Sequence, residues 1–116
     1  MKQNFEFPEE QEFLIREFNF SEKHDTDEGV ISYSTLYKGG RKLLVSLFPF
    51  GYDSSIKVEI IEEGISMVSF TRSNVTSIEF QSWSNEQVIR VYWSNADKEC
   101  LIYYKPRPRL FYGELV

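Results

Sequence analysis

This sequence has one cysteine, one histidine and no long apolar run, and each shortage restricts what the chain can be. Cys100 is the single cysteine among 116 residues, which excludes an internal disulfide and a zinc site of four thiolates. A chain that needs no disulfide fits a reducing compartment, so we expect a cytoplasmic protein. No stretch reaches the about 18 apolar residues of a membrane helix, and the first residues lack the apolar core of a signal peptide. We therefore expect neither export nor a membrane partner.

Catalytic and cofactor motifs are also missing. His24 is the single histidine, and it stands beside Asp25, Asp27 and Glu28, a grouping that a general base or a metal site could use in principle. No serine or cysteine lies in a nucleophile elbow, and no glycine-rich fingerprint for phosphate precedes a helix. A calcium loop that begins at Asp25 would need a glutamate where Leu36 stands. We predict a protein that is not an enzyme and holds no cofactor or metal.

Aromatic residues are abundant, and their alternation with polar residues defines the predicted elements. Pro8 followed by two glutamates is typical of a helix start, and Leu14 and Phe18 lie four residues apart, so we predict a helix over about residues 8–19. From residue 30 onward the apolar period is two and turn residues recur at strand-length spacing. This pattern predicts strands over about residues 30–38, 41–48, 56–62, 65–71, 75–83, 87–93 and 99–105.

The order of these elements predicts the fold. Short turns between successive strands favour an antiparallel meander, and a sheet of six to seven strands twists strongly. We predict a single domain over residues 1–116 in the α+β class, with the N-terminal helix packed on a strongly curled, half-barrel-like meander.

Acidic residues are concentrated in the first quarter of the chain. Residues 1–28 hold three basic and nine acidic residues, a net charge of −6, whereas residues 29–116 hold ten basic and nine acidic residues, a net charge of +1. Such a one-sided field attracts a basic partner and repels nucleic acid. Tryptophan is common at the centre of protein interfaces, and both tryptophans end predicted strands. The partner-binding residues that we predict are Glu9, Glu10, Glu12, Asp25, Asp27, Glu28, Trp83 and Trp93.

In size, acidic charge and helix-plus-meander pattern the chain resembles the small acidic immunity proteins that bacteria make against cognate toxins. The resemblance implies a non-catalytic inhibitor whose partner is a basic protein, often a nuclease. We adopt this as the leading hypothesis for function.

Two alternatives are left open. A curled sheet could hold a small ligand, as a binding protein or an enzyme, in a concavity lined by Tyr33, Phe80 and Tyr92, with carboxylates drawn from Glu59, Glu62, Glu63 and Glu79. Single-stranded nucleic acid could bind the basic segment Lys105–Arg109, although the pI of about 4.9 argues against it. A second basic cluster spans Lys38–Lys42. We interpret the two prolines of the Lys105–Arg109 segment as a guard that keeps an edge strand from pairing.

Overall fold

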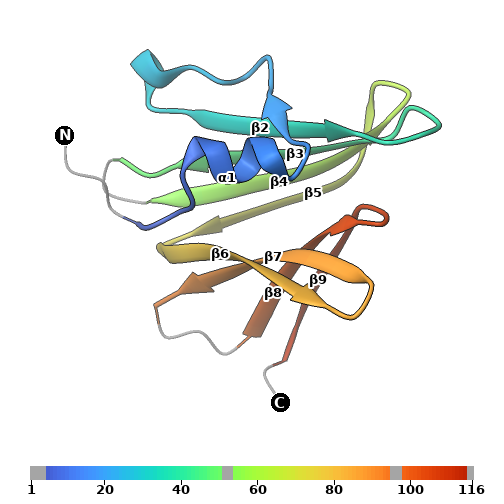
Figure 1. Cartoon of the computed structure of the whole chain (residues 1–116). Coiled ribbons are helices and arrows are strands. Elements are labelled where there is room, and N and C mark those ends of the chain that lie inside the picture. Colours follow the sequence, from blue (N-terminus) through green and yellow to red (C-terminus); the bar gives the residue numbers. More distant parts are fainter. Residues whose placement is uncertain (1–4, 51–53, 95–97, 115–116) are drawn as a thin grey trace.

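Two antiparallel sheets enclose one hydrophobic core in the computed structural model, which describes residues 5–50, 54–94 and 98–114 (Figure 1). The first sheet has the strand order β1 (Asn19–Phe20), β2 (Ile31–Leu36), β3 (Lys42–Phe48), β4 (Ser55–Glu62) and β5 (Ile65–Ser73). The second has the order β6 (Val75–Trp83), β7 (Glu86–Trp93), β8 (Lys98–Lys105) and β9 (Arg109–Glu114). One short helix, α1 (Glu10–Ile15), and one 3-10 turn, η1 (Thr26–Glu28), complete the described elements.

The predicted single, strongly curled sheet is wrong, because the meander divides after β5. Asn74 takes a left-handed backbone with φ 60°, and β6 then begins a separate sheet instead of pairing with β5. Each sheet buries its inner face against the other, so no half-barrel is needed to bury apolar side chains. With one helix of six residues, the architecture is mostly β, and the α+β class describes it only loosely.

The seven predicted strands correspond to β2 through β8, and two further strands were missed. Strand β1 has only two residues. Strand β9 was missed because Pro106 and Pro108 were interpreted as a barrier to pairing. Both prolines instead lie in the turn before β9, and Tyr103 of β8 pairs with Arg109 immediately after them. A proline in a turn removes no hydrogen bond from the ladder, so the strand can follow directly.

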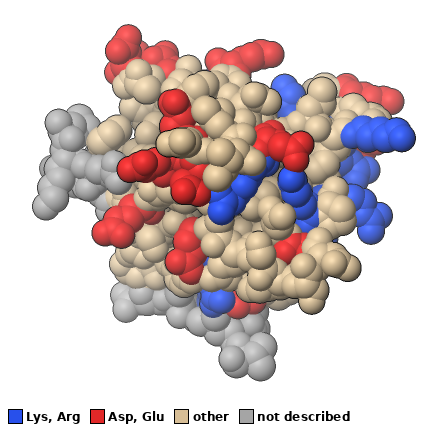
Figure 2. All heavy atoms as spheres, in the orientation of Figure 1, with Lys and Arg blue, Asp and Glu red and all other residues tan. Residues whose placement is uncertain are grey.

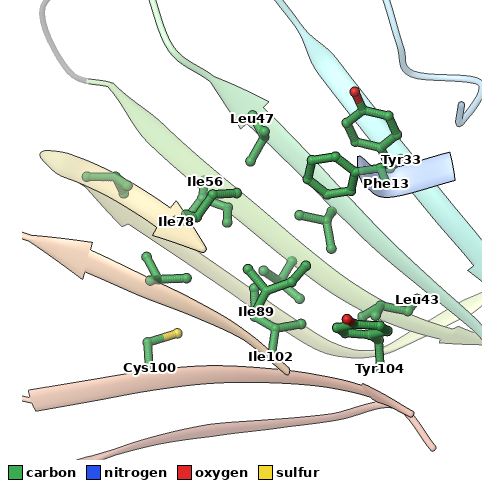
Figure 3. Close-up of a cluster of buried hydrophobic side chains, with 14 of the residues drawn as sticks. Phe13, Tyr33, Leu43, Leu47, Ile56, Ile78, Ile89, Cys100, Ile102 and Tyr104 are labelled. Atoms are coloured by element: carbon green, nitrogen blue, oxygen red, sulfur yellow. The ribbon is translucent and has the colours of Figure 1, made fainter. Parts of the chain in front are cut away.

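Alternation along the strands sorts residues between the core and the surface, as the sequence pattern predicts. Val45 pairs with Tyr33 on one side and with Val58 on the other, and all three are buried on the inner face. On the second sheet Ile89 pairs with Ile102, and both are buried in the same core (Figure 3).

Helix α1 closes one side of the core through a single aromatic side chain. The ring of Phe13 is stacked on Tyr33 of the first sheet, with centroids 4.0 Å apart, and it meets the edge of Phe80 of the second sheet at 4.9 Å. The helix is shorter than predicted because Glu17 takes a left-handed φ of 71° and the N–H of Phe18 donates to the carbonyl of Phe13 at 3.1 Å. This Schellman-type end stops the helix before Phe18, so Leu14 is exposed instead of sharing a face with it.

The segment between β1 and β2 covers polar residues on the outer face of the first sheet. Ser32 and Ser46 are buried there with their hydroxyl oxygens 2.8 Å apart, and Ser21 donates to the Ser32 hydroxyl at 2.6 Å. Lys23 Nζ lies 3.1 Å from a carboxylate oxygen of Glu59, which is also buried. Burial alone raises the pKa of Glu59, but Lys23, with help from Lys57, lowers it below the ordinary value.

None of the helices in the described part of the chain is long and apolar enough to cross a membrane.

The role of α1 in the core can be tested with Phe13→Ala. Because Phe13 is fully buried between the two sheets, its truncation should lower the free energy of unfolding by about 3–5 kcal/mol, measured by urea denaturation. Ile15→Ala is the matched control, since Ile15 lies on the same helix and is 66% exposed. An equal, small loss in both variants would show that α1 contributes nothing to the core.

The Lys23–Glu59 contact predicts a dependence of stability on pH. The folded chain lowers the pKa of Glu59, so the contact stabilises the fold above the ordinary pKa of a glutamate, about 4.3, and is lost as the pH falls through the lower folded value. Glu59→Gln should therefore have a lower free energy of unfolding than the wild type at pH 7. This difference should be smaller at about pH 3. Glu63→Gln, at an exposed turn, should change stability little at either pH. If Glu59→Gln were less stable than the wild type by the same amount at both pH values, the charge of Glu59 would not be what stabilises the fold.

Candidate protein-binding surface

The predicted acidic residues lie on α1 and η1, on one side of the molecule. We call Glu9, Glu10, Glu12, Asp25, Asp27 and Glu28 the acidic face, and all six are exposed. Acidic side chains predominate over this side, whereas Lys and Arg gather toward the opposite end (Figure 2). The acidic face therefore lies apart from the cations at the opposite end, although ion pairs join charges of opposite sign elsewhere in the fold.

Local hydrogen bonds determine which of these carboxylates remain available. Asp25 Oδ1 accepts the backbone N–H groups of Asp27 and Glu28 at 3.1 and 3.3 Å, so it holds the η1 turn together as its N-cap. Glu12 lies 2.7 Å from Arg16, four residues later on the chain. The four remaining carboxylates take part in no ion pair within the described residues; they are Glu9, Glu10, Asp27 and Glu28.

His24 has a structural role in this region. Its Nδ1 accepts the backbone N–H of Ser32 at 3.1 Å, and its ring lies 4.3 Å from the ring of Phe20. Because Nδ1 accepts this hydrogen bond, it carries no proton and its lone pair is already used. In the described ranges, three or more His, Cys, Asp or Glu side chains nowhere come together in a way that could hold a metal ion.

The structure separates the two tryptophans. Trp83, at the end of β6, is 40% exposed and can contact a partner. Trp93 is only 4% exposed, because the guanidinium of Arg72 lies 4.6 Å from its ring and Tyr112 lies alongside it at 6.0 Å. Trp93 packs in the core, so we leave it out of the binding surface.

Sequence reasoning missed an apolar cluster on the outer face of the second sheet. Val88, Leu101 and Tyr103 are buried there, apart from the main core, and Arg109 stacks on Tyr103 at 3.6 Å. Phe111, which pairs with Leu101, is partly exposed. The signal was visible as apolar residues at both parities of β8, which is unusual for a strand with a solvated face.

The aromatic residues of the small-ligand alternative do not line a concavity. Tyr33 and Phe80 both pack against Phe13, which fills the space between the sheets. The hydroxyl of Tyr92 instead donates to Glu79 at 2.6 Å on the surface, and this bond lowers the pKa of Glu79.

The carboxylates of the same alternative do not form an acid–base pair. Glu59 and Glu79 lie on β4 and β6, in different sheets, and each is bound to its own partners. Glu62 ends β4, and Glu63 lies in the turn that follows it.

The structure brings together the two basic clusters of the sequence. Their side chains meet at the ends of the β2–β3 and β8–β9 hairpins, and we call this region the basic end; its cations are Lys38, Arg41, Lys105, Arg107 and Arg109. Ion pairs neutralise part of its charge: Arg41 lies 3.4 Å from Glu62, and Arg109 lies 3.1 Å from Glu86. Of the rings beside the Lys105–Arg109 segment, Arg109 covers Tyr103 and Tyr104 is buried, whereas Phe111 and Tyr112 are exposed.

Comparison with known proteins finds a similar fold among solved structures but no relative by sequence. No model of a known protein family matches the chain, and no curated protein matches it. A chain in the solved structure of a contact-dependent growth inhibition toxin–immunity protein complex from Klebsiella pneumoniae 342 is similar, with a TM-score of 0.79 and 14% sequence identity. The match covers 98% of this chain and 100% of that chain, so the two share one fold along their whole length.

Proposed function

We propose that this chain is a non-catalytic inhibitor of the immunity type that binds a basic toxin through its acidic face. The observation that carries the proposal is the fold shared along the whole chain with a member of a toxin–immunity complex. A fold alone does not define a function, so the proposal also depends on the chemistry of the surface.

That chemistry favours the inhibitor and not the toxin of such a pair. Four exposed carboxylates of the acidic face have no ion-pair partner within the described residues, as expected of a surface that awaits cations from another protein. The groups best suited to acid–base catalysis are committed to the fold. His24 accepts a backbone hydrogen bond, Glu59 is bound to Lys23, and Glu79 accepts from Tyr92.

Two parts of the surface have different roles in this proposal. The acidic face steers a basic protein during approach, because exposed charges act over about 8–10 Å at physiological salt. Trp83 supplies an aromatic contact of the kind that dominates binding energy once the proteins touch.

Charge-steered binding can be tested with a basic protein that an affinity pull-down with this chain recovers from its native cell. Glu10→Gln with Glu28→Gln should slow association roughly threefold or more at low salt, measured by surface plasmon resonance, and the difference should vanish at about 0.5 M salt. Glu63→Gln with Glu99→Gln removes the same number of charges elsewhere and should leave the rate nearly unchanged. Equal rates for the two double variants would refute steering by the acidic face.

A growth assay separates the inhibitor from the toxin. Expression of this chain alone should leave bacterial growth unchanged, and its co-expression with the recovered partner should restore the growth that the partner alone arrests. Growth arrest by this chain alone would assign it to the toxin side, and failure to protect would refute the immunity function.

A further inference from the structure

Three hollows in the surface meet at the basic end. Their volumes are about 200, 330 and 400 Å³, and Arg41 and Pro108 line all three. The first two are lined mainly by arginine, lysine, proline and glutamate. The third differs, because four apolar side chains from β4, β5 and β9 line it: Ile60, Met67, Val68 and Leu110.

A β-bulge in β5 directs apolar side chains to this region. Ile60 pairs with Val68 but the next residue, Ile61, pairs with Ser66, so Met67 is the extra residue of the bulge. A bulge re-aims the side chains beside it. Met67 is 61% exposed and Ile65 is 64% exposed, although long apolar side chains at the rim of a groove are seldom left in water without a reason.

The backbone of β5 offers a second kind of contact. This strand of nine residues ends the five-stranded sheet, and its outer edge has no strand partner among the described residues. Residues 65–71 carry no charge, proline or glycine, the features with which proteins usually protect an exposed edge. An extended segment laid along β5 could therefore add a strand to the sheet.

The charge around the groove defines the partner further. Arg41, Arg109 and Glu62 line the apolar hollow, where Arg41 is paired with Glu62 and Arg109 with Glu86. Arg107 lines the two hollows beside it. Arg107 and Lys38 take part in no ion pair in the part of the chain that the structure describes. Free cations next to an apolar groove fit carboxylates next to apolar side chains.

We propose that the groove between β5 and β9, together with the basic end, is a second docking site that takes an extended protein segment whose apolar side chains are flanked by carboxylates. The site lies apart from the acidic face and takes a partner of opposite charge, so it does not depend on the proposed immunity function. An extended protein segment fits better than a nucleic acid, because five of the eight residues that line the hollow between β5 and β9 are apolar and the edge of β5, unpaired among the described residues, offers backbone hydrogen bonds to an extended chain.

Titration of the ¹⁵N-labelled chain with a defined peptide tests this site by NMR. The probe is a capped peptide of about ten residues in which leucine alternates with glutamate, and the matched control has lysine in place of glutamate. The acidic peptide should shift the amide signals of residues 65–73 and of Arg107, Arg109 and Leu110, and the lysine peptide should bind at least tenfold more weakly.

Two pairs of variants locate the binding. Arg107→Gln should weaken binding of the acidic peptide about threefold or more. Lys57→Gln removes the same charge on β4, away from the groove, and should leave the binding unchanged. Val68→Ser should weaken it similarly, whereas Ile15→Ser, at an exposed apolar residue on α1, should not. Retained wild-type spectra outside the altered residue establish that each variant is folded.

Several results would overturn the proposal. They are the absence of shifts in β5 at millimolar acidic peptide, equal binding of the two peptides, or the same shifts produced by an oligouridine. Shifts that depend on protein concentration without peptide would assign the groove to a second copy of this chain. The toxin assays above are unaffected by these outcomes, so failure of one proposal is distinguishable from failure of the other.

Discussion

The stacking of Phe13 on Tyr33 fixes helix α1 against the core. A helix of six residues cannot hold itself in place by its own hydrogen bonds, so its position depends on the one side chain that it buries. Phe13 also contacts Phe80 of the second sheet, and it thereby joins both sheets to the segment that carries nine of the eighteen acidic residues. The orientation of the α1 part of the acidic face is thus a consequence of a contact in the core, whereas the η1 part is held by its own hydrogen bonds.

Separation of charge is the second organising feature. The acidic face lies on α1 and η1, and the basic end lies at the tips of the β2–β3 and β8–β9 hairpins (Figure 2). A net charge of −5 hides this arrangement, because ten basic and nine acidic residues nearly cancel over residues 29–116. The two ends therefore suit partners of opposite charge, as in the two docking proposals, although the chain as a whole is acidic.

Local patterns predicted the strands well and the helix poorly. Alternation in residues 56–60 correctly placed Ile56, Val58 and Ile60 on the inner face of β4. The helix prediction depended on a spacing of four between Leu14 and Phe18, but the left-handed Glu17 ends the helix between them. A non-glycine residue with positive φ gives little signal in a sequence, because its cost is met by contacts that form elsewhere.

The sequence by itself determined the shortage of cysteine and histidine, the acidic bias of residues 1–28 and the alternation that forms the strands. The tertiary structure alone decided that the meander divides after β5, that Trp93 is buried while Trp83 is exposed, and that two basic clusters lie together. Each of these depends on contacts between residues far apart in the chain. Lys38 and Arg107, for example, line one hollow although more than sixty positions separate them. Periodicity and turn residues report the conformation of neighbours along the chain, whereas the packing of one sheet on another determines which distant side chains meet.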